Sequence, residues 1–138
     1  MVFVENIEKL TLNNTDYRRV IFTSDYSQLV LMSIPVGEDI DFEIHPYVDQ
    51  FFRIEQGNGE LYIGKEGQKV YKFQDQFAMI VPHNTYHRVV NTGNVPLKLY
   101  TIYSPPNHSK GKIEHEKPRS NKLEEDCKYK KILRTIFL

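Results

Sequence analysis

Turn-forming residues recur at intervals of about ten positions along the first hundred residues, and this spacing restricts the fold more than any other feature. The clearest turn is Gln56-Gly57-Asn58-Gly59, because Gly and Asn tolerate the positive φ angles of tight hairpins. The segments between turns are short and rich in strand-forming residues. They predict strands at residues 18–22, 28–34, 40–45, 51–55, 60–63, 70–73, 77–81, 88–90 and 97–103. Many short strands with frequent turns are typical of a β-sandwich or β-barrel, so we expect an all-β domain.

The end of the chain has a helical pattern instead. Ser120 is a suitable N-cap, and acidic residues precede basic ones, which is the order that the helix dipole favours. One face of this predicted helix carries the apolar residues Tyr129, Ile132, Leu133, Ile136 and Phe137. The sequence therefore predicts a barrel domain at residues 1–118 and a basic amphipathic C-terminal α-helix at residues 119–138.

Composition indicates a globular protein. The chain has 138 residues, 40% of them hydrophobic, which is enough for one domain with a sizeable core. No apolar run approaches the length of about 18 residues that a membrane-spanning helix needs, and the N-terminus lacks the pattern of a secretory signal. A single cysteine, Cys127, excludes an internal disulfide and a multi-cysteine zinc site. We therefore expect a cytoplasmic protein without a membrane partner.

The formal net charge is zero but unevenly distributed. Residues 1–109 hold 9 basic and 13 acidic side chains, whereas residues 110–138 hold 9 basic and 5 acidic ones. A basic tail can bind nucleic acid, but acids interspersed with the bases favour a solvated helix. Nucleic acid is therefore not the expected partner.

The segment EIHPYVDQ, residues 43–50, combines polar groups with a strand-like pattern. Alternation along a strand places Glu43 and His45 on one face, and Phe42 and Ile44 on the other. Taken alone, this pattern favours Phe42 and Ile44 in the core, with Glu43 and His45 in solvent. The alternative is that the polar pair faces inward and binds a ligand.

Two later strands favour the alternative. Gln50 has the same alternation as Phe52 and Ile54, and His87 has the same alternation as Val89. Both polar side chains are therefore predicted to point into the barrel. Buried polar groups need partners, because an unpaired one is costly. We accordingly expect the polar pair of residues 43–50 to face inward as well.

Two spaced motifs resemble those of the cupin superfamily. The first motif, G-x5-H-x-H-x(3,4)-E-x6-G, corresponds to Gly37, Glu43, His45, Gln50 and Gly57. The second, G-x5-P-x-G-x2-H-x3-N, corresponds to Gln76, Pro82, Asn84, His87 and Asn91. Phrases such as VDQFFRIEQGNGEL are similar to those of small single-domain cupins labelled mannose-6-phosphate isomerase-like. The resemblance covers roughly residues 28–116 and implies a double-stranded β-helix, or jelly-roll, barrel.

The chain departs from these motifs at the metal ligands. In cupins, two His and one Glu of the first motif bind a divalent metal together with the His of the second. Carried over by position, the resemblance implies Glu43, His45, Gln50 and His87 as ligands, with Glu in place of the first His and Gln in place of Glu. This set has nitrogen and oxygen donors and no thiolate, which suits one Mn, Fe, Co, Ni or Zn ion. Asp49 would replace Gln50 if the strand register differed by one residue.

The remaining histidines are expected at the surface. His83 lies in a predicted loop beside Pro82, which favours an exposed position at the rim of the barrel. His108 and His115 could close over the site, although simple surface positions are favoured. No catalytic residue can be assigned from the sequence.

The resemblance implies a small-molecule ligand and a homodimer. The first functional hypothesis is a metal-dependent isomerase, lyase or dioxygenase acting on a sugar or an organic acid. The second is a non-catalytic cupin that binds or senses a small ligand. The third is an oligomeric structural protein in which the metal only stiffens the barrel.

Overall fold

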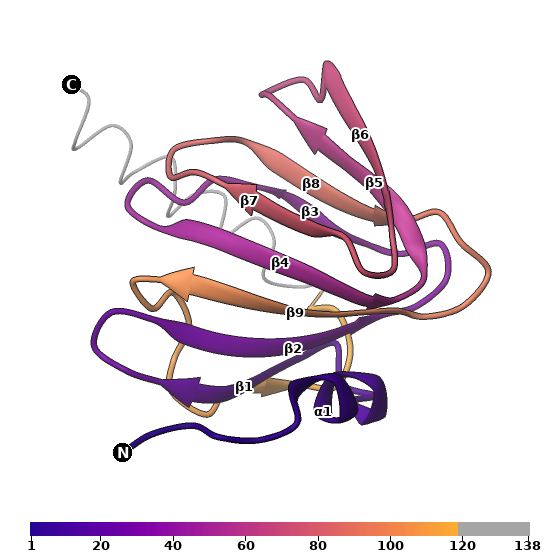
Figure 1. Cartoon of the computed structure of the whole chain (residues 1–138). Coiled ribbons are helices and arrows are strands. Elements are labelled where there is room, and N and C mark those ends of the chain that lie inside the picture. Colours follow the sequence, from indigo (N-terminus) through magenta and orange to yellow (C-terminus); the bar gives the residue numbers. More distant parts are fainter. Residues whose placement is uncertain (119–138) are drawn as a thin grey trace.

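The computed structural model describes residues 1–118, which form two facing antiparallel β-sheets (Figure 1). One sheet has the strand order β10-β1-β2-β9-β4-β7, and the other has the order β3-β8-β5-β6. The elements are α1 (Ile7–Asn13), β1 (Arg18–Thr23), β2 (Gln28–Ile34), β3 (Asp39–Glu43), β4 (Asp49–Gln56), β5 (Asn58–Ile63), β6 (Lys69–Gln74), β7 (Ala78–Val81), β8 (His87–Asn91), β9 (Leu97–Ser104) and β10 (Ile113–Glu114). The arrangement confirms the predicted jelly-roll barrel. The predicted C-terminal helix and Cys127 lie outside the described residues.

The core lies between the two sheets. Pairing of β2 with β9 runs in register from Gln28–Tyr103 to Ile34–Leu97, and this ladder forms the centre of the larger sheet. Alternate residues of the strands point inward and are buried. The core cluster includes Val30, Met32, Ile34, Phe52, Ile54, Leu61, Phe73, Val89, Leu97 and Leu99. Period-two alternation therefore explains most of the core.

The turn positions of both sequence motifs keep a left-handed backbone. Gly37 and Gly57 have φ angles of 80° and 96°. Gln76 and Asn84, which stand where the second motif has glycine, have φ angles of 71° and 59°. An L-residue costs about 1–2 kcal/mol in this region, and Asn less than most. The backbone conformation persists although the glycines are absent.

Helix α1 and strand β10 are not predicted by the sequence pattern, which indicates a helix at the end of the chain and none before it. The Asn6 side chain caps α1 by accepting a hydrogen bond from Lys9 N at 3.0 Å. The helix packs against the larger sheet, near β2, β4 and β9. At the C-cap of α1, the Asn14 carbonyl oxygen accepts a hydrogen bond from Nζ of buried Lys98 at 2.6 Å. These contacts hold the N-terminal segment on the outside of the barrel (Figure 1).

Phe42 is 38% exposed and does not lie in the core, which agrees with the inward orientation expected for Glu43 and His45. Strand β3 pairs with β8 at Ile40–Val89 and at Glu43–His87, with a register shift between the two pairs. Three steps along β3 thus match two steps along β8, which is the signature of a β-bulge. The extra residue reverses the alternation, so Ile40 and Glu43 both face the interior and Phe42 faces out.

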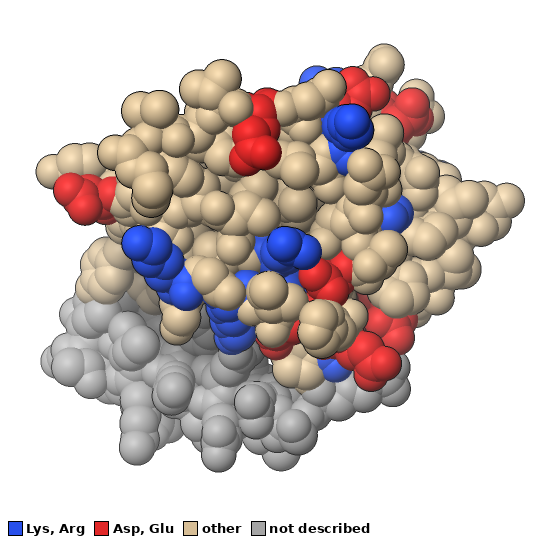
Figure 2. Space-filling view, turned by 90° about the horizontal axis from the view of Figure 1, so that it is seen from below, with Lys and Arg blue, Asp and Glu red and all other residues tan. Residues whose placement is uncertain are grey.

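The surface carries both signs of charge. On the face shown in Figure 2, Lys and Arg side chains lie near Asp and Glu side chains. Among residues 1–118, no helix has the length and hydrophobicity needed to cross a bilayer.

Candidate metal centre

Four polar side chains converge in the barrel interior at one end of the strands. Glu43 is the last residue of β3, and His45 follows it in the connection to β4. Gln50 lies near the start of β4, and His87 begins β8. His45, Gln50 and His87 are buried. The structure therefore brings together the four residues that motif spacing and strand alternation select.

The distances between their donor atoms suit a single metal ion. Glu43 Oε1 lies 3.5 Å from His45 Nε2 and 3.5 Å from His87 Nε2. Gln50 Oε1 lies 3.2 Å from His87 Nε2. Ligand atoms about 2.0–2.2 Å from a metal are separated by about 2.8–3.1 Å at the right angles of an octahedral shell and by about 3.3–3.6 Å in a tetrahedral shell. The observed separations of 3.2–3.5 Å lie closest to the tetrahedral values.

Hydrogen bonds on the far side of two of these groups fix their orientation. Gln50 Nε2 donates to Thr101 Oγ1 at 3.0 Å, which turns Oε1 of the amide toward the centre. His87 Nδ1 lies 2.9 Å from Thr85 O. Because a carbonyl oxygen can only accept, Nδ1 carries the proton and Nε2 presents its lone pair to the centre. Metal-binding histidines are commonly oriented in this way.

The arrangement of donor atoms at the centre calls for a positive charge between them. With Nδ1 protonated, a neutral His87 directs the lone pair of Nε2 at two oxygen acceptors, Gln50 Oε1 and Glu43 Oε1. Glu43 Oε1 is also buried and has no hydrogen-bond partner among the described residues. Adjacent lone pairs repel one another unless a positive charge, either a proton or a metal ion, lies between them. The residues present therefore fit a divalent cation.

Electrostatics keep the carboxylate ionised. Burial raises the pKa of Glu43, but His45 and His87 lower it more, and the pKa lies well below its usual value. Burial lowers the pKa of His87, but Glu43 and the Thr85 carbonyl raise it more, so the pKa of this imidazole is raised. Glu43 thus supplies the formal negative charge of the centre at neutral pH.

A second row of side chains extends from the centre through Tyr103. The His45 and Tyr103 rings meet edge to face, with centroids 5.7 Å apart. Tyr103 in turn contacts His108, whose Nε2 lies 3.2 Å from the Tyr103 hydroxyl. The expectation that His108 is a simple surface residue is therefore wrong. Burial, together with the nearby Arg18 charge, lowers the pKa of His108 to about 3, so its imidazole is neutral at physiological pH.

The buried side chain of Gln28 determines where His108 lies. Its Oε1 accepts hydrogen bonds from Asn107 N at 3.1 Å and His108 N at 2.8 Å. Its Nε2 donates to His108 O at 2.7 Å. These three bonds fasten the segment after β9 to the start of β2 and hold His108 over Tyr103.

The other candidate residues lie away from the centre. Asp49 is 61% exposed at its side chain and accepts a hydrogen bond from His83 N, so Gln50 and not Asp49 faces inward. His83 is exposed beside Asp49, as expected for a rim residue. His115 is exposed as expected, with Nδ1 2.6 Å from Asp16 Oδ1.

Sequence reasoning misses three inward polar residues, namely Arg18, Gln28 and Thr101. All three are buried. Arg18 and Gln28 have the same alternation as the core residues Val20 and Val30, and Thr101 pairs with Val30 across β2 and β9. The alternation that selects Gln50 and His87 would therefore have found these residues too.

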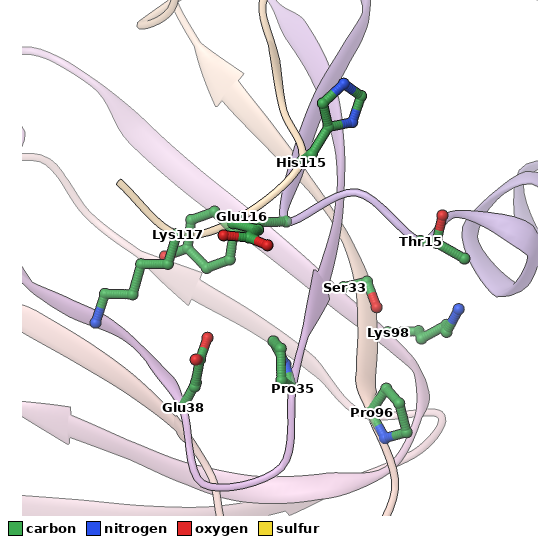
Figure 3. Close-up of a pocket in the computed structure, with 10 residues that line it drawn as sticks. Thr15, Ser33, Pro35, Glu38, Pro96, Lys98, His115, Glu116 and Lys117 are labelled. Atoms are coloured by element: carbon green, nitrogen blue, oxygen red, sulfur yellow. The ribbon is translucent and has the colours of Figure 1, made fainter. Parts of the chain in front are cut away.

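A separate pocket of about 810 Å³ opens at the opposite end of β2 and β9 (Figure 3). Its lining includes Ser33, Glu38 and Glu116, and none of the four residues of the candidate centre. The ammonium groups of Lys98 and Lys117, which also line it, are engaged by Asn14 O and by the carboxylates of Asp39 and Asp41. This pocket is distinct from the candidate centre.

Comparison with known proteins agrees with this geometry. Residues 30–103, more than half of the chain, match the family model described as Cupin domain. The chain is 49% identical over 119 residues to the uncharacterized protein YrkC of Bacillus subtilis, covering 83% of this chain and 63% of YrkC. It is 45% identical over 120 residues to the uncharacterized protein L612 of Acanthamoeba polyphaga mimivirus, covering 86% and 75% of the two chains. The crystal structure of BH2720 from Bacillus halodurans superposes with a TM-score of 0.82 at 46% identity, covering 83% of this chain and 89% of that one.

This chain thus spans less than two thirds of the length of YrkC. The match to the family model over more than half of the chain and the jelly-roll topology lead to one assignment. The chain belongs to the Cupin domain family.

Proposed function

We propose that the barrel binds one divalent metal ion through Glu43, His45, Gln50 and His87 and acts as a metal-dependent enzyme on a small polar molecule. The observation that carries the proposal is the convergence of their donor atoms around a buried carboxylate oxygen that has no hydrogen-bond partner within residues 1–118. When bound, such an ion would polarise a carbonyl or hydroxyl group of the ligand or lower the pKa of a bound water.

The surrounding residues orient groups and exclude water. Thr101 and Thr85 hold the donor atoms of Gln50 and His87 toward the centre. Phe52 packs edge to face against His87, with ring centroids 6.3 Å apart, and shields that side from solvent. The neutral imidazole of His108 shares a hydrogen bond with the Tyr103 hydroxyl.

One observation favours the alternative, a cupin that binds or senses a small ligand without converting it. The pKa of His108, about 3, makes this imidazole a weak base at neutral pH. General bases work best when their pKa lies near the operating pH. A ligand that binds to the metal-loaded protein and is recovered unchanged would support this alternative.

Metal content across a set of variants tests the proposal. Wild-type protein is reconstituted with Mn, Fe, Co, Ni and Zn in turn, and bound metal is measured by elemental analysis. His45→Ala and His87→Ala should abolish occupancy, and Glu43→Gln should lose more metal than Gln50→Ala, because it removes the only ligand charge. Gln50→Glu should keep or tighten binding.

The exposed neighbours His83→Ala and Asp49→Asn serve as matched controls and should bind metal like the wild type. If the wild-type protein binds none of the five metals, or if His45→Ala keeps full occupancy, the metal assignment is wrong.

We further propose that the protein is a homodimer. Supporting this, Ile80 is 70% exposed on β7, which is an edge strand of the larger sheet. Apolar side chains on an unpaired edge favour association. Sedimentation at micromolar concentration should give a dimer for the wild type and a monomer for Ile80→Lys. A cytoplasmic location and membership of the mannose-6-phosphate isomerase-like subgroup are parts of the proposal that rest on the sequence.

A further inference from the structure

Arg18 is a buried cation whose Nε has no hydrogen-bond partner in the described part of the chain. It begins β1, shares the inward alternation of Val20, and is only 6% exposed. Its Nη1 donates to Glu114 Oε1 on the neighbouring strand β10. Its Nε is buried and has no partner among residues 1–118. A guanidinium has five N–H donors, and leaving buried donors unpaired is costly, so the position lacks an acceptor.

The guanidinium of Arg18 interacts electrostatically with Glu43 of the candidate centre and with Tyr103 and His108 beside it. It packs over the Tyr17 ring, with the guanidinium carbon 5.3 Å from the ring centroid. Burial lowers the pKa of Arg18, but Tyr103 and Glu43 raise it more, so the guanidinium stays charged. Arg18 also contributes to the lowered pKa of His108. Arg18 is thus close to the carboxylate of the centre and to the row of side chains beside it.

The charges of this region do not balance once a metal is bound. Glu43 and Glu114 each carry one negative charge, and Arg18 carries one positive charge. A divalent ion would therefore leave an excess of one positive charge. Lys112 Nζ lies 3.7 Å from Glu114 Oε1, but its side chain is 35% exposed, so solvent screens its charge. Uncompensated charge in a low-dielectric interior is unfavourable, so a monoanion is the ligand that this region would bind best.

We propose that Arg18 forms a carboxylate-binding subsite beside the metal centre, so that the small molecule bound there is an organic acid and not a neutral sugar. This inference rests on the proposed metal-dependent function. Because Glu114 takes Nη1, the edge formed by Nε and Nη2 is left for a ligand. That edge matches the two oxygens of a carboxylate, which arginine binds in a bidentate manner.

The test compares lactate with lactamide, its neutral analogue of nearly the same shape, by calorimetry on Mn-loaded protein. Lactate should bind at least about tenfold more tightly than lactamide, and Arg18→Met should weaken lactate binding about ten- to hundredfold. Arg18→Lys, which keeps the charge but loses the planar fork, should fall between. Arg19→Met is the matched control, because Arg19 is the next residue and its side chain is 53% exposed.

A double variant distinguishes loss of the subsite from loss of folding. Arg18→Met leaves the partly buried Glu114 unpaired, whereas Arg18→Met combined with Glu114→Gln removes both charges together. Both forms should lose preference for lactate over lactamide. Manganese content is measured in every variant, so that loss of metal is not mistaken for loss of the subsite.

The outcomes separate the two proposals. If manganese binds but wild type does not prefer lactate, or if both Arg18 variants bind it like Arg19→Met, the subsite is wrong and the metal function stands. If the wild type binds none of the five metals, the metal function fails, and lactate binding to metal-free protein decides the subsite. Weaker binding by Arg18→Met than by Arg19→Met would then support it, and equal binding would overturn it.

Discussion

Replacing Thr101 by Val would test whether the Gln50 amide is held ready for a metal ion. Thr101 is fully buried, and its Oγ1 accepts the hydrogen bond from Gln50 Nε2 at 3.0 Å. Val has nearly the same shape, so the substitution removes the acceptor with little change in packing. Gln50 Nε2 then lacks a partner, and nothing prevents the amide from turning its nitrogen toward His87.

Two separate effects should follow. An unsatisfied buried donor costs about 1–3 kcal/mol, so the free energy of unfolding of the metal-free protein should fall by that amount. Removing a partner that orients a metal ligand typically weakens metal affinity about 10–100-fold, equivalent to about 1.4–2.7 kcal/mol. The first effect is measured by urea denaturation without metal. The second is measured by competition with a fluorescent chelator.

Two controls make the result specific. Thr101→Ser keeps the hydroxyl group and should bind metal within a few-fold of the wild type. In a Gln50→Glu background the two oxygens of the new side chain are equivalent, so Thr101→Val should lower metal affinity much less. If Thr101→Val binds metal as tightly as Thr101→Ser, the amide is not oriented by this contact, and our account of the centre is wrong.

Three further predictions concern stability and are checked by urea denaturation. Gly59→Ala should lower the free energy of unfolding by about 2–3 kcal/mol, because a Cβ would lie 2.2 Å from the Val90 backbone oxygen; an unchanged midpoint would contradict this. Gln76→Gly should raise it by about 0.5–1 kcal/mol by relieving a positive φ of 71°, and Asn84→Gly should raise it less; a larger gain at Asn84 would contradict this. The folded-state pKa of His108 is lowered from 6.5 to about 3, so its contribution to stability is present above 6.5 and is lost as the pH falls toward 3. His108→Gln should therefore lose less unfolding free energy than the wild type between pH 6.5 and about 4, and equal losses would refute the assignment.

The barrel follows from the sequence because its strands are regular. The pattern predicts a strand at residues 28–34, and β2 spans Gln28–Ile34. Glycine and asparagine turns mark the ends of most other strands. Helix α1, at Ile7–Asn13, is too short for a periodic apolar face to stand out. Strand β10 forms only because a distant segment returns to pair with β1.

The sequence predicts side-chain positions in the candidate centre where strand alternation sets them. It does not predict them where contacts between distant segments set them. Alternation places Gln50 and His87 inward, as observed. Alternation continued from the core residue Ile40 would place Phe42 inward, but a bulge adds one residue without leaving a signal in the apolar pattern. The position of His108 depends on Gln28, which lies 80 residues earlier in the chain. No local pattern reports such a contact.

The four residues of the centre are unequally divided between the two sheets. Glu43 and His87 belong to the smaller sheet, His45 lies in the connection, and Gln50 is the donor that comes from the larger sheet. An ion held by all four residues would cross-link the two sheets, and Gln50 would be its one ligand from the larger sheet. Metal release would then require the two sheets to separate at the end of β3. The rate of metal exchange would therefore report how often the barrel opens locally there.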